Sequence, residues 1–275
     1  MRPMIPQPSR FGMKQTLLAL ALLTAYASAS ALPVFTLNPA AAGLAGTSFT
    51  ADNIIVSDFG SVKSTGATSF SESGYLSVQN FQQGQGSAFV PTGLNSTYGL
   101  YIQFSGTGTQ SAANPLTQQT SGTFNTLNYT LFGYNGGPAT FGFDAANNAT
   151  INIGGATPIA LATGSLIAGS VGTMPASDGN GGGSFVPSAN ASLTFHAGSS
   201  GFFGSPTPFY NIALTSFTNT VSQVTPFDGG FRISQGGGSI NFSTSVSPIP
   251  EPETYALMLA GLGAVGWISR RRRKI

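Results

Sequence analysis

The segment Tyr98-Gly99-Leu100-Tyr101-Ile102-Gln103-Phe104 places apolar side chains at every second position. Successive residues of a β-strand point to opposite faces, so this alternation predicts a half-buried strand. The same period of two recurs at 127–131, 141–143, 151–153 and 193–195. Between the two ends of the chain, no stretch carries the i, i+3, i+4 apolar stripe of an amphipathic helix. The sequence therefore predicts a single all-β domain with many short strands, of the sandwich or jelly-roll type.

Glycine-rich stretches interrupt this pattern. Residues 153–175 are compatible with strands or with a loop, and residues 178–184 are typical of a flexible loop. Gln235–Ser239 separates two alternating segments, 231–233 and 240–242, which predicts a hairpin with its turn at the glycines. The 178–184 loop offers one carboxylate, Asp178, whereas calcium sites need several. We therefore predict no metal site.

The composition restricts the chemistry that the chain can perform. Only 7% of its 275 residues are charged, and it contains no cysteine and one histidine. A disulfide framework, a thiolate metal site and a cysteine nucleophile are excluded. His196 follows Phe195 at the end of an expected strand, where a solvent-facing or packed imidazole is expected rather than a general base. We expect no cofactor and no enzymatic activity, although a glycosidase needs only two carboxylates that meet in space, which a sequence alone does not reveal.

The N-terminus has the order of features found in secretory signal peptides. Arg10 and Lys14 precede an apolar run at 16–23, and small residues follow. The small residues Ala29 and Ala31 fit the A-x-A cleavage pattern. We expect signal peptidase to cleave after Ala31, or alternatively after Ala29, so that residues 1–31 form a removable signal helix. Met13 is an alternative start for the chain.

The C-terminus carries three features in order. These are the triplet Pro250-Glu251-Pro252, the apolar run 255–269, and a basic cluster formed by Arg270, Arg271, Arg272, Arg273 and Lys274. As a helix the apolar run is about 22 Å long, shorter than the bilayer core of about 30 Å. Snorkelling of the arginines would extend its reach, and positive charge favours the cytoplasmic side. Within the C-terminal segment 248–275, we expect the apolar run to form a transmembrane helix that anchors the protein transiently in the inner membrane.

This C-terminal order resembles the PEP-CTERM sorting signal of Gram-negative bacteria. The resemblance implies export across the inner membrane and processing by an exosortase near Pro250, Glu251 and Pro252. It also implies a final location at the cell surface or outside the cell, in association with exopolysaccharide.

The segment between the two ends, residues 32–247, is the expected extracellular domain. It carries two basic residues, Lys63 and Arg232, against six carboxylates, which argues against nucleic-acid binding. Short segments such as 35–39, 98–101 and 203–210 resemble the flocculation-associated group of PEP-CTERM proteins. That resemblance implies a role in biofilm or floc formation through extracellular polymer. The sequence thus predicts a structural or adhesive matrix protein; the alternative is a secreted carbohydrate-binding or carbohydrate-active protein.

Overall fold

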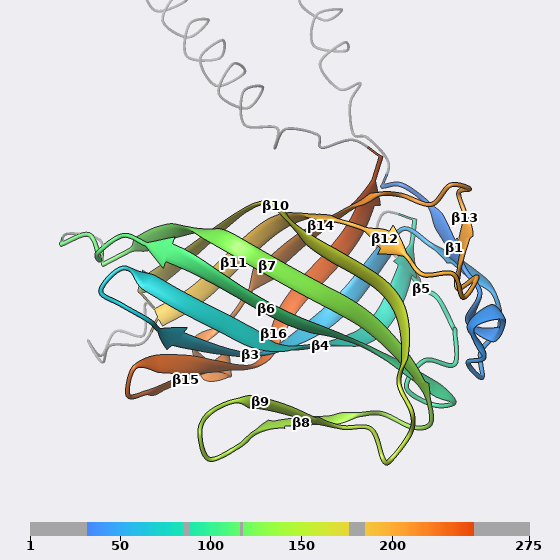
Figure 1. The fold of residues 1–275 in the computed structure, drawn as a ribbon, viewed down its shortest axis with the longest axis horizontal. Helices are drawn as coiled ribbons and strands as arrows, with labels where there is room; N and C mark the ends of the chain where they lie inside the picture. Colours follow the sequence, from blue (N-terminus) through green and yellow to red (C-terminus); the bar gives the residue numbers. More distant parts are fainter. Residues whose placement is uncertain (1–31, 85–87, 116–117, 176–184, 245–275) are drawn as a thin grey trace, which may run out of the picture. The chain divides into compact units, whose positions relative to one another are not determined.

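A computed structural model describes residues 32–84, 88–115, 118–175 and 185–244 (Figure 1). All described strands belong to one compact unit, Pro33–Ile275. The expected signal helix and C-terminal helix lie outside the described residues. Within the described part of the chain, no helix is long and apolar enough to span a membrane.

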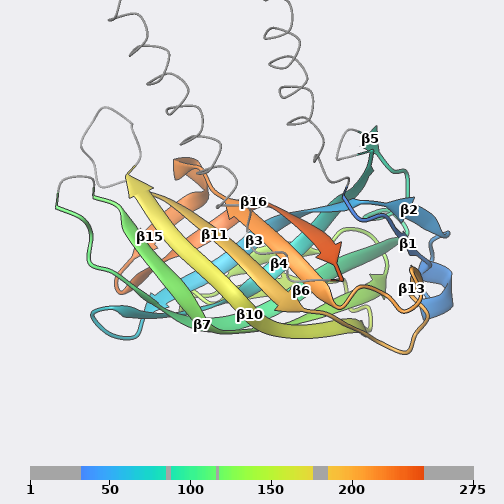
Figure 2. The ribbon, with the colours of Figure 1, turned by 90° about the horizontal axis from the view of Figure 1, so that it is seen from above.

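Eight strands form one closed antiparallel barrel (Figures 1 and 2). Each strand pairs with the next barrel strand along the chain, and the last one, β16, pairs with the first, β3. The barrel is therefore built from successive hairpins and has no free edge. Its strands are β3 (Asn53–Ser64), β4 (Ser69–Gln83), β6 (Tyr98–Gln110), β7 (Thr120–Asn135), β10 (Ile159–Pro175), β11 (Phe185–Thr194), β14 (Ile212–Thr218) and β16 (Gly230–Ser243).

A smaller sheet closes one end of the barrel together with an aromatic cluster, which consists of Phe35, Phe195, Phe203, Phe209 and Phe242 (Figure 1). The sheet has the order β13-β1-β2, and Phe35 at its centre is fully buried against Phe242 of the barrel. The elements at this end are β1 (Phe35–Leu37), the 3-10 helix η1 (Pro39–Ala42), β2 (Phe49–Ala51), β5 (Ala88–Phe89), β12 (His196–Ala197) and β13 (Phe203–Ser205). At the other end lie the short 3-10 helix η2 (Val221–Gln223) and β15 (Val224–Phe227), which pairs with β16.

The alternation in the sequence separates the inside of the barrel from the outside. On β6, Leu100, Ile102 and Phe104 line the interior, whereas Gln103 and Ser105 face outward and are exposed. The inward side chains of all eight strands form one hydrophobic core. Eight strands enclose a space that side chains nearly fill, with room at most for one small ligand.

Glycines on the inner face make room for aromatic rings. A Cβ atom at Gly164 would collide with the Thr194 carbonyl oxygen and the Tyr129 ring, and one at Gly108 would collide with Phe70. Pairing a residue that lacks a side chain with a large one keeps the narrow interior filled without overlap. At these positions any larger residue would displace a ring or the neighbouring strand.

The structure confirms the all-β prediction and changes two details. The expected sandwich is a closed barrel, because sequential hairpin pairing brings β16 back to β3. The predicted hairpin at Gln235–Ser239 is wrong, since β16 runs without a break from Gly230 to Ser243. Gln235, at φ 61°, forms a bulge there, and Gly238 lies against the ring of Phe217. Of the ambiguous segment 153–175, residues Ile159–Pro175 form the strand β10.

Candidate functional site

The outer face of β4, β6 and β7 carries rows of neutral polar side chains. One row runs across the three strands through Ser73, Ser105 and Asn128, which are directly opposite one another. The row beside it runs through Tyr75, Gln103 and Thr130 in the same way. Cross-strand neighbours on one face lie about 4.5–5.5 Å apart, so each row is a compact set of hydroxyl and amide groups.

These rows form the floor of a groove of about 330 Å³. Its lining consists of Ser73, Gly74, Tyr75, Gln103, Phe104, Ser105, Asn128, Tyr129, Thr130 and Ala149. No lining residue carries a charge at neutral pH, and the half-buried Tyr75 ring supplies aromatic surface. The groove volume is at the lower end of the range for small-molecule sites. Such a site can donate and accept many hydrogen bonds and can pack a ring against one flat face of a ligand.

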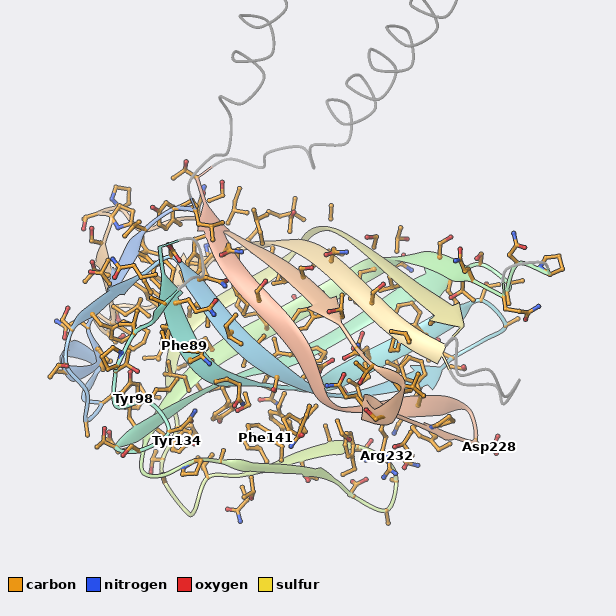
Figure 3. The ribbon with its side chains drawn as sticks, turned by 180° about the vertical axis from the view of Figure 1, so that it is seen from behind. Phe89, Tyr98, Tyr134, Phe141, Asp228 and Arg232 are labelled. Carbon is orange, nitrogen blue, oxygen red and sulfur yellow. The ribbon has the colours of Figure 1, made fainter. Side chains whose placement is uncertain are left out.

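A hairpin outside the barrel forms one border of this groove (Figure 3). It consists of β8 (Thr140–Phe143) and β9 (Ala149–Asn152) and interrupts the connection between β7 and β10. Phe141 stacks on Phe59 of β3 with ring centroids 4.7 Å apart, and it also contacts Tyr75 at 6.3 Å. These ring contacts fix the hairpin against the wall that carries the groove.

Polar contacts hold the tip of the same hairpin. The Lys63 ammonium donates hydrogen bonds to the Ala146 carbonyl oxygen (3.1 Å) and to Asn148 Oδ1 (2.6 Å). The Arg232 guanidinium lies 5.2 Å from the centre of the Phe143 ring, a cation–π contact. Asp144 accepts hydrogen bonds from the Asn148 side chain and backbone, which lower the pKa of the Asp144 carboxyl. Both basic side chains of the described barrel therefore point outward, toward the hairpin.

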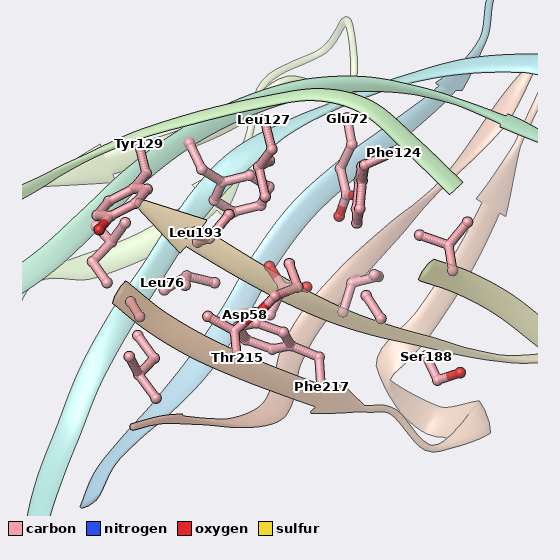
Figure 4. Close-up of a pocket in the computed structure, with 18 of the residues that line it drawn as sticks. Asp58, Glu72, Leu76, Phe124, Leu127, Tyr129, Ser188, Leu193, Thr215 and Phe217 are labelled. Atoms are coloured by element: carbon pink, nitrogen blue, oxygen red, sulfur yellow. The ribbon is translucent and has the colours of Figure 1, made fainter. Parts of the chain in front are cut away.

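The interior of the barrel holds two carboxyl groups, Asp58 of β3 and Glu72 of β4 (Figure 4). They meet because Gly60 and Gly74 lie opposite each other between them in the register of the two strands. A Cβ atom at Gly60 would lie 3.1 Å from Asp58 Oδ1 and 3.3 Å from Glu72 Oε1, so the glycine makes room for both groups. Asp58 is 4% exposed, whereas Glu72 is half-buried. The two carboxyls border an interior cavity of about 150 Å³ that is otherwise largely apolar.

Burial favours the protonated form of both groups. It raises the pKa of Glu72 to about 7. Burial also raises the pKa of Asp58, and the nearby Glu72 charge raises it further. Both shifts oppose the simultaneous ionisation of the two carboxyls.

The sites predicted from the sequence lie elsewhere. Three sets of predicted residues are outside the described part of the chain. They are the sorting-signal residues Pro250, Glu251, Pro252, Arg270, Arg271, Arg272 and Arg273, the cleavage-site residues Ala29 and Ala31, and the loop residue Asp178. His196 is exposed on β12 and lines neither the groove nor the interior cavity. The described residues contain no group of three or more His, Cys, Asp or Glu side chains that could hold a metal ion.

Sequence reasoning missed both the groove and the carboxyl pair. The alternation of Gln103 with Phe104 already indicated which side chains of β6 face outward. The pattern did not reveal which strands pair with β6. It also did not reveal that the hairpin at 140–152 packs against the outer face of the barrel. Asp58 and Glu72 are fourteen positions apart, and only the register of β3 with β4 brings them together.

Comparison with known proteins identifies the C-terminal segment. The PEP-CTERM protein-sorting motif matches residues 248–274. This match confirms the sorting signal that the sequence predicted, and the motif indicates an exported protein targeted to an exosortase. Neither curated proteins nor solved structures give a match to the chain.

Proposed function

We propose that this exosortase-targeted, exported protein is a non-enzymatic component of the extracellular polysaccharide matrix and promotes biofilm or floc formation. The observation that carries the proposal is the neutral groove on β4, β6 and β7, with Tyr75 beside rows of hydroxyl and amide groups. Polysaccharides offer hydroxyl groups that can hydrogen-bond to such rows, and sugar rings have apolar faces that can pack on an aromatic ring.

The expected binding to a single sugar unit is weak. Each neutral hydrogen bond contributes about 0.5–1.5 kcal/mol net, because it replaces a bond to water. A polymer that engages several copies of the protein gains through effective concentration, without any new contact. This mode suits a matrix protein, which must stay associated with a polymer without high affinity for its individual units.

The route to the matrix is part of the proposal. Signal peptidase would remove residues 1–31, and the C-terminal segment would hold the protein transiently in the inner membrane of a Gram-negative cell. Exosortase processing near Pro250 would then release the barrel to the cell surface or the medium.

Co-sedimentation with the producer's own polysaccharide tests the proposed binding. The variant is Gln103→Ala/Asn128→Ala, which removes two exposed groove amides. The matched control is Asn190→Ala/Ser216→Ala, an exposed cross-strand pair on β11 and β14, away from the groove. We expect the groove variant to lose at least half of the bound fraction and the control to bind like the wild type.

The same assay includes two outcomes that contradict the proposal. The groove lining is uncharged, so binding should persist in molar salt; complete elution would indicate an ionic binder instead. Release of reducing ends from the polysaccharide would favour a carbohydrate-active enzyme. In that case Asp58 and Glu72 would be the carboxylates to test first, because they meet in space within the described part of the chain.

A further inference from the structure

The interior cavity has the size of a site for a small organic molecule. Its volume is about 150 Å³, and its walls include Leu76, Phe124, Leu127, Leu193 and Phe217 (Figure 4). An apolar cavity of about this volume in a protein core can accept a ligand the size of benzene. The barrel therefore has room for one ring-sized guest between its side chains.

The cavity is more accessible from one end of the barrel. Toward the small sheet that closes the other end, Phe81, Leu100 and Phe242 are 1–3% exposed. Near the carboxyl pair, Phe70 and Ile233 are buried, but Val62 and Phe217 are only half-buried and Ser64 is exposed. This gradient of exposure indicates that a small molecule would enter from the end away from the aromatic cluster.

Two acceptor atoms in the lining of the cavity lack a donor. Among the described residues, Asp58 Oδ1 has no hydrogen-bond partner, and neither does Asn219 Oδ1 in the same lining. Both atoms are acceptors. Lys63 and Arg232 cannot supply the missing donors, because each contacts the outer hairpin instead. A buried acceptor without a donor destabilises the folded protein, and a ligand that donates hydrogen bonds would remove this penalty.

We propose that the barrel binds a small, mainly apolar primary amine, with its ammonium group between Asp58 and Glu72 and its hydrocarbon part among the surrounding rings. An ammonium has three donors and no acceptor, which complements a site whose unpartnered atoms are acceptors. Its positive charge lets the second carboxyl ionise, and the Phe124 ring in the same lining adds apolar surface for the hydrocarbon part (Figure 4). A neutral alcohol of the same size would fill the cavity without this charge pairing.

Calorimetric titration of the protein recovered from producing cells tests the proposal. The probes are benzylamine and its neutral counterpart benzyl alcohol, at pH 7. The variants are Asp58→Asn and Glu72→Gln, which keep the side-chain size and remove one charge each. Asp228→Asn, in the exposed turn between β15 and β16, is the matched control.

We expect Kd for benzylamine to rise at least tenfold in each interior variant and to stay within twofold of the wild type in the control. Benzyl alcohol should bind all four proteins within a factor of two, which shows that the cavity is intact. The proposal is overturned if benzylamine fails to bind the wild type, or binds the interior variants equally well. An equal loss of benzylamine affinity in the Asp228→Asn variant would also overturn the proposal, because this result would indicate that the amine pairs with carboxylates at the surface. Polysaccharide co-sedimentation should not change in the interior variants, so this test is independent of the groove.

Discussion

Replacing Glu72 by glutamine should make the protein more stable at alkaline pH. Burial raises the pKa of Glu72 from its ordinary value of 4.5 to about 7 in the folded state. Between these two values the folded protein holds a proton that the unfolded chain has released, so the stability of the wild type falls as the pH rises. Each pKa unit corresponds to about 1.4 kcal/mol, which gives a loss of about 3 kcal/mol by pH 8. Glutamine does not ionise and avoids that loss.

Chemical denaturation of wild type and variant at several pH values measures this effect. We expect equal free energies of unfolding at pH 4, and an advantage for Glu72→Gln that grows from about pH 4.5 and levels off above pH 7. Asp58 and Tyr129 are the other titratable groups that face the cavity, and the raised pKa of Asp58 leaves part of the pH dependence in the variant. The free energy of unfolding of the double variant Asp58→Asn/Glu72→Gln should therefore depend even less on pH. If Glu72→Gln and the wild type keep the same pH dependence, the carboxyl is solvated and the reasoning fails.

Two further predictions concern the barrel wall and the sorting signal. Gly164→Ala should destabilise the protein by about 1–3 kcal/mol in thermal unfolding, because the added methyl group collides with the Thr194 carbonyl oxygen and the Tyr129 ring. Gly142→Ala in the outer hairpin should have little effect, because the nearest neighbour of a Cβ there is 3.6 Å away. Replacing Arg270–Arg273 with serine removes charges that cost about 2.5–3.5 kcal/mol each at the bilayer centre. We expect less processing near Pro250 in that variant by intact mass, and unchanged processing would show that the arginines are incidental.

The local pattern of the sequence was enough to predict the class of fold and to assign the side chains of individual strands to one face or the other. The alternation of Leu100, Gln103 and Phe104 assigns each side chain to the inside or the outside before any pairing is known. Closure into a barrel did not follow from it, because closure depends on how eight strands tilt and pair around a ring. The local pattern was also misleading at Gln235–Ser239. A glycine run that is typical of a turn serves there to accommodate the ring of Phe217 inside a continuous strand.

The candidate sites were less predictable because both depend on contacts between distant segments. The groove needs three neighbouring strands in one register, with Ala149 of the outer hairpin at its border. The carboxyl pair needs Gly60 opposite Gly74, since a side chain at either position would occupy the space between Asp58 and Glu72 or collide with the neighbouring strand. A scattered set of carboxylates in a sequence therefore says little about which two of them will meet.

The barrel wall separates the two proposed binding functions although the same strands carry both. Gln103 lines the outer groove and Ile102 lies in the core, so adjacent residues of β6 serve different surfaces. On β4, likewise, Tyr75 lines the outer groove and Leu76 lines the interior cavity. Since a strand alternates its side chains between two faces, a substitution on one face leaves the side chains of the other in place. The outer surface can thus adapt to a polymer while the interior keeps the packing that stability requires, and the effects of groove and cavity variants should be additive when they are combined.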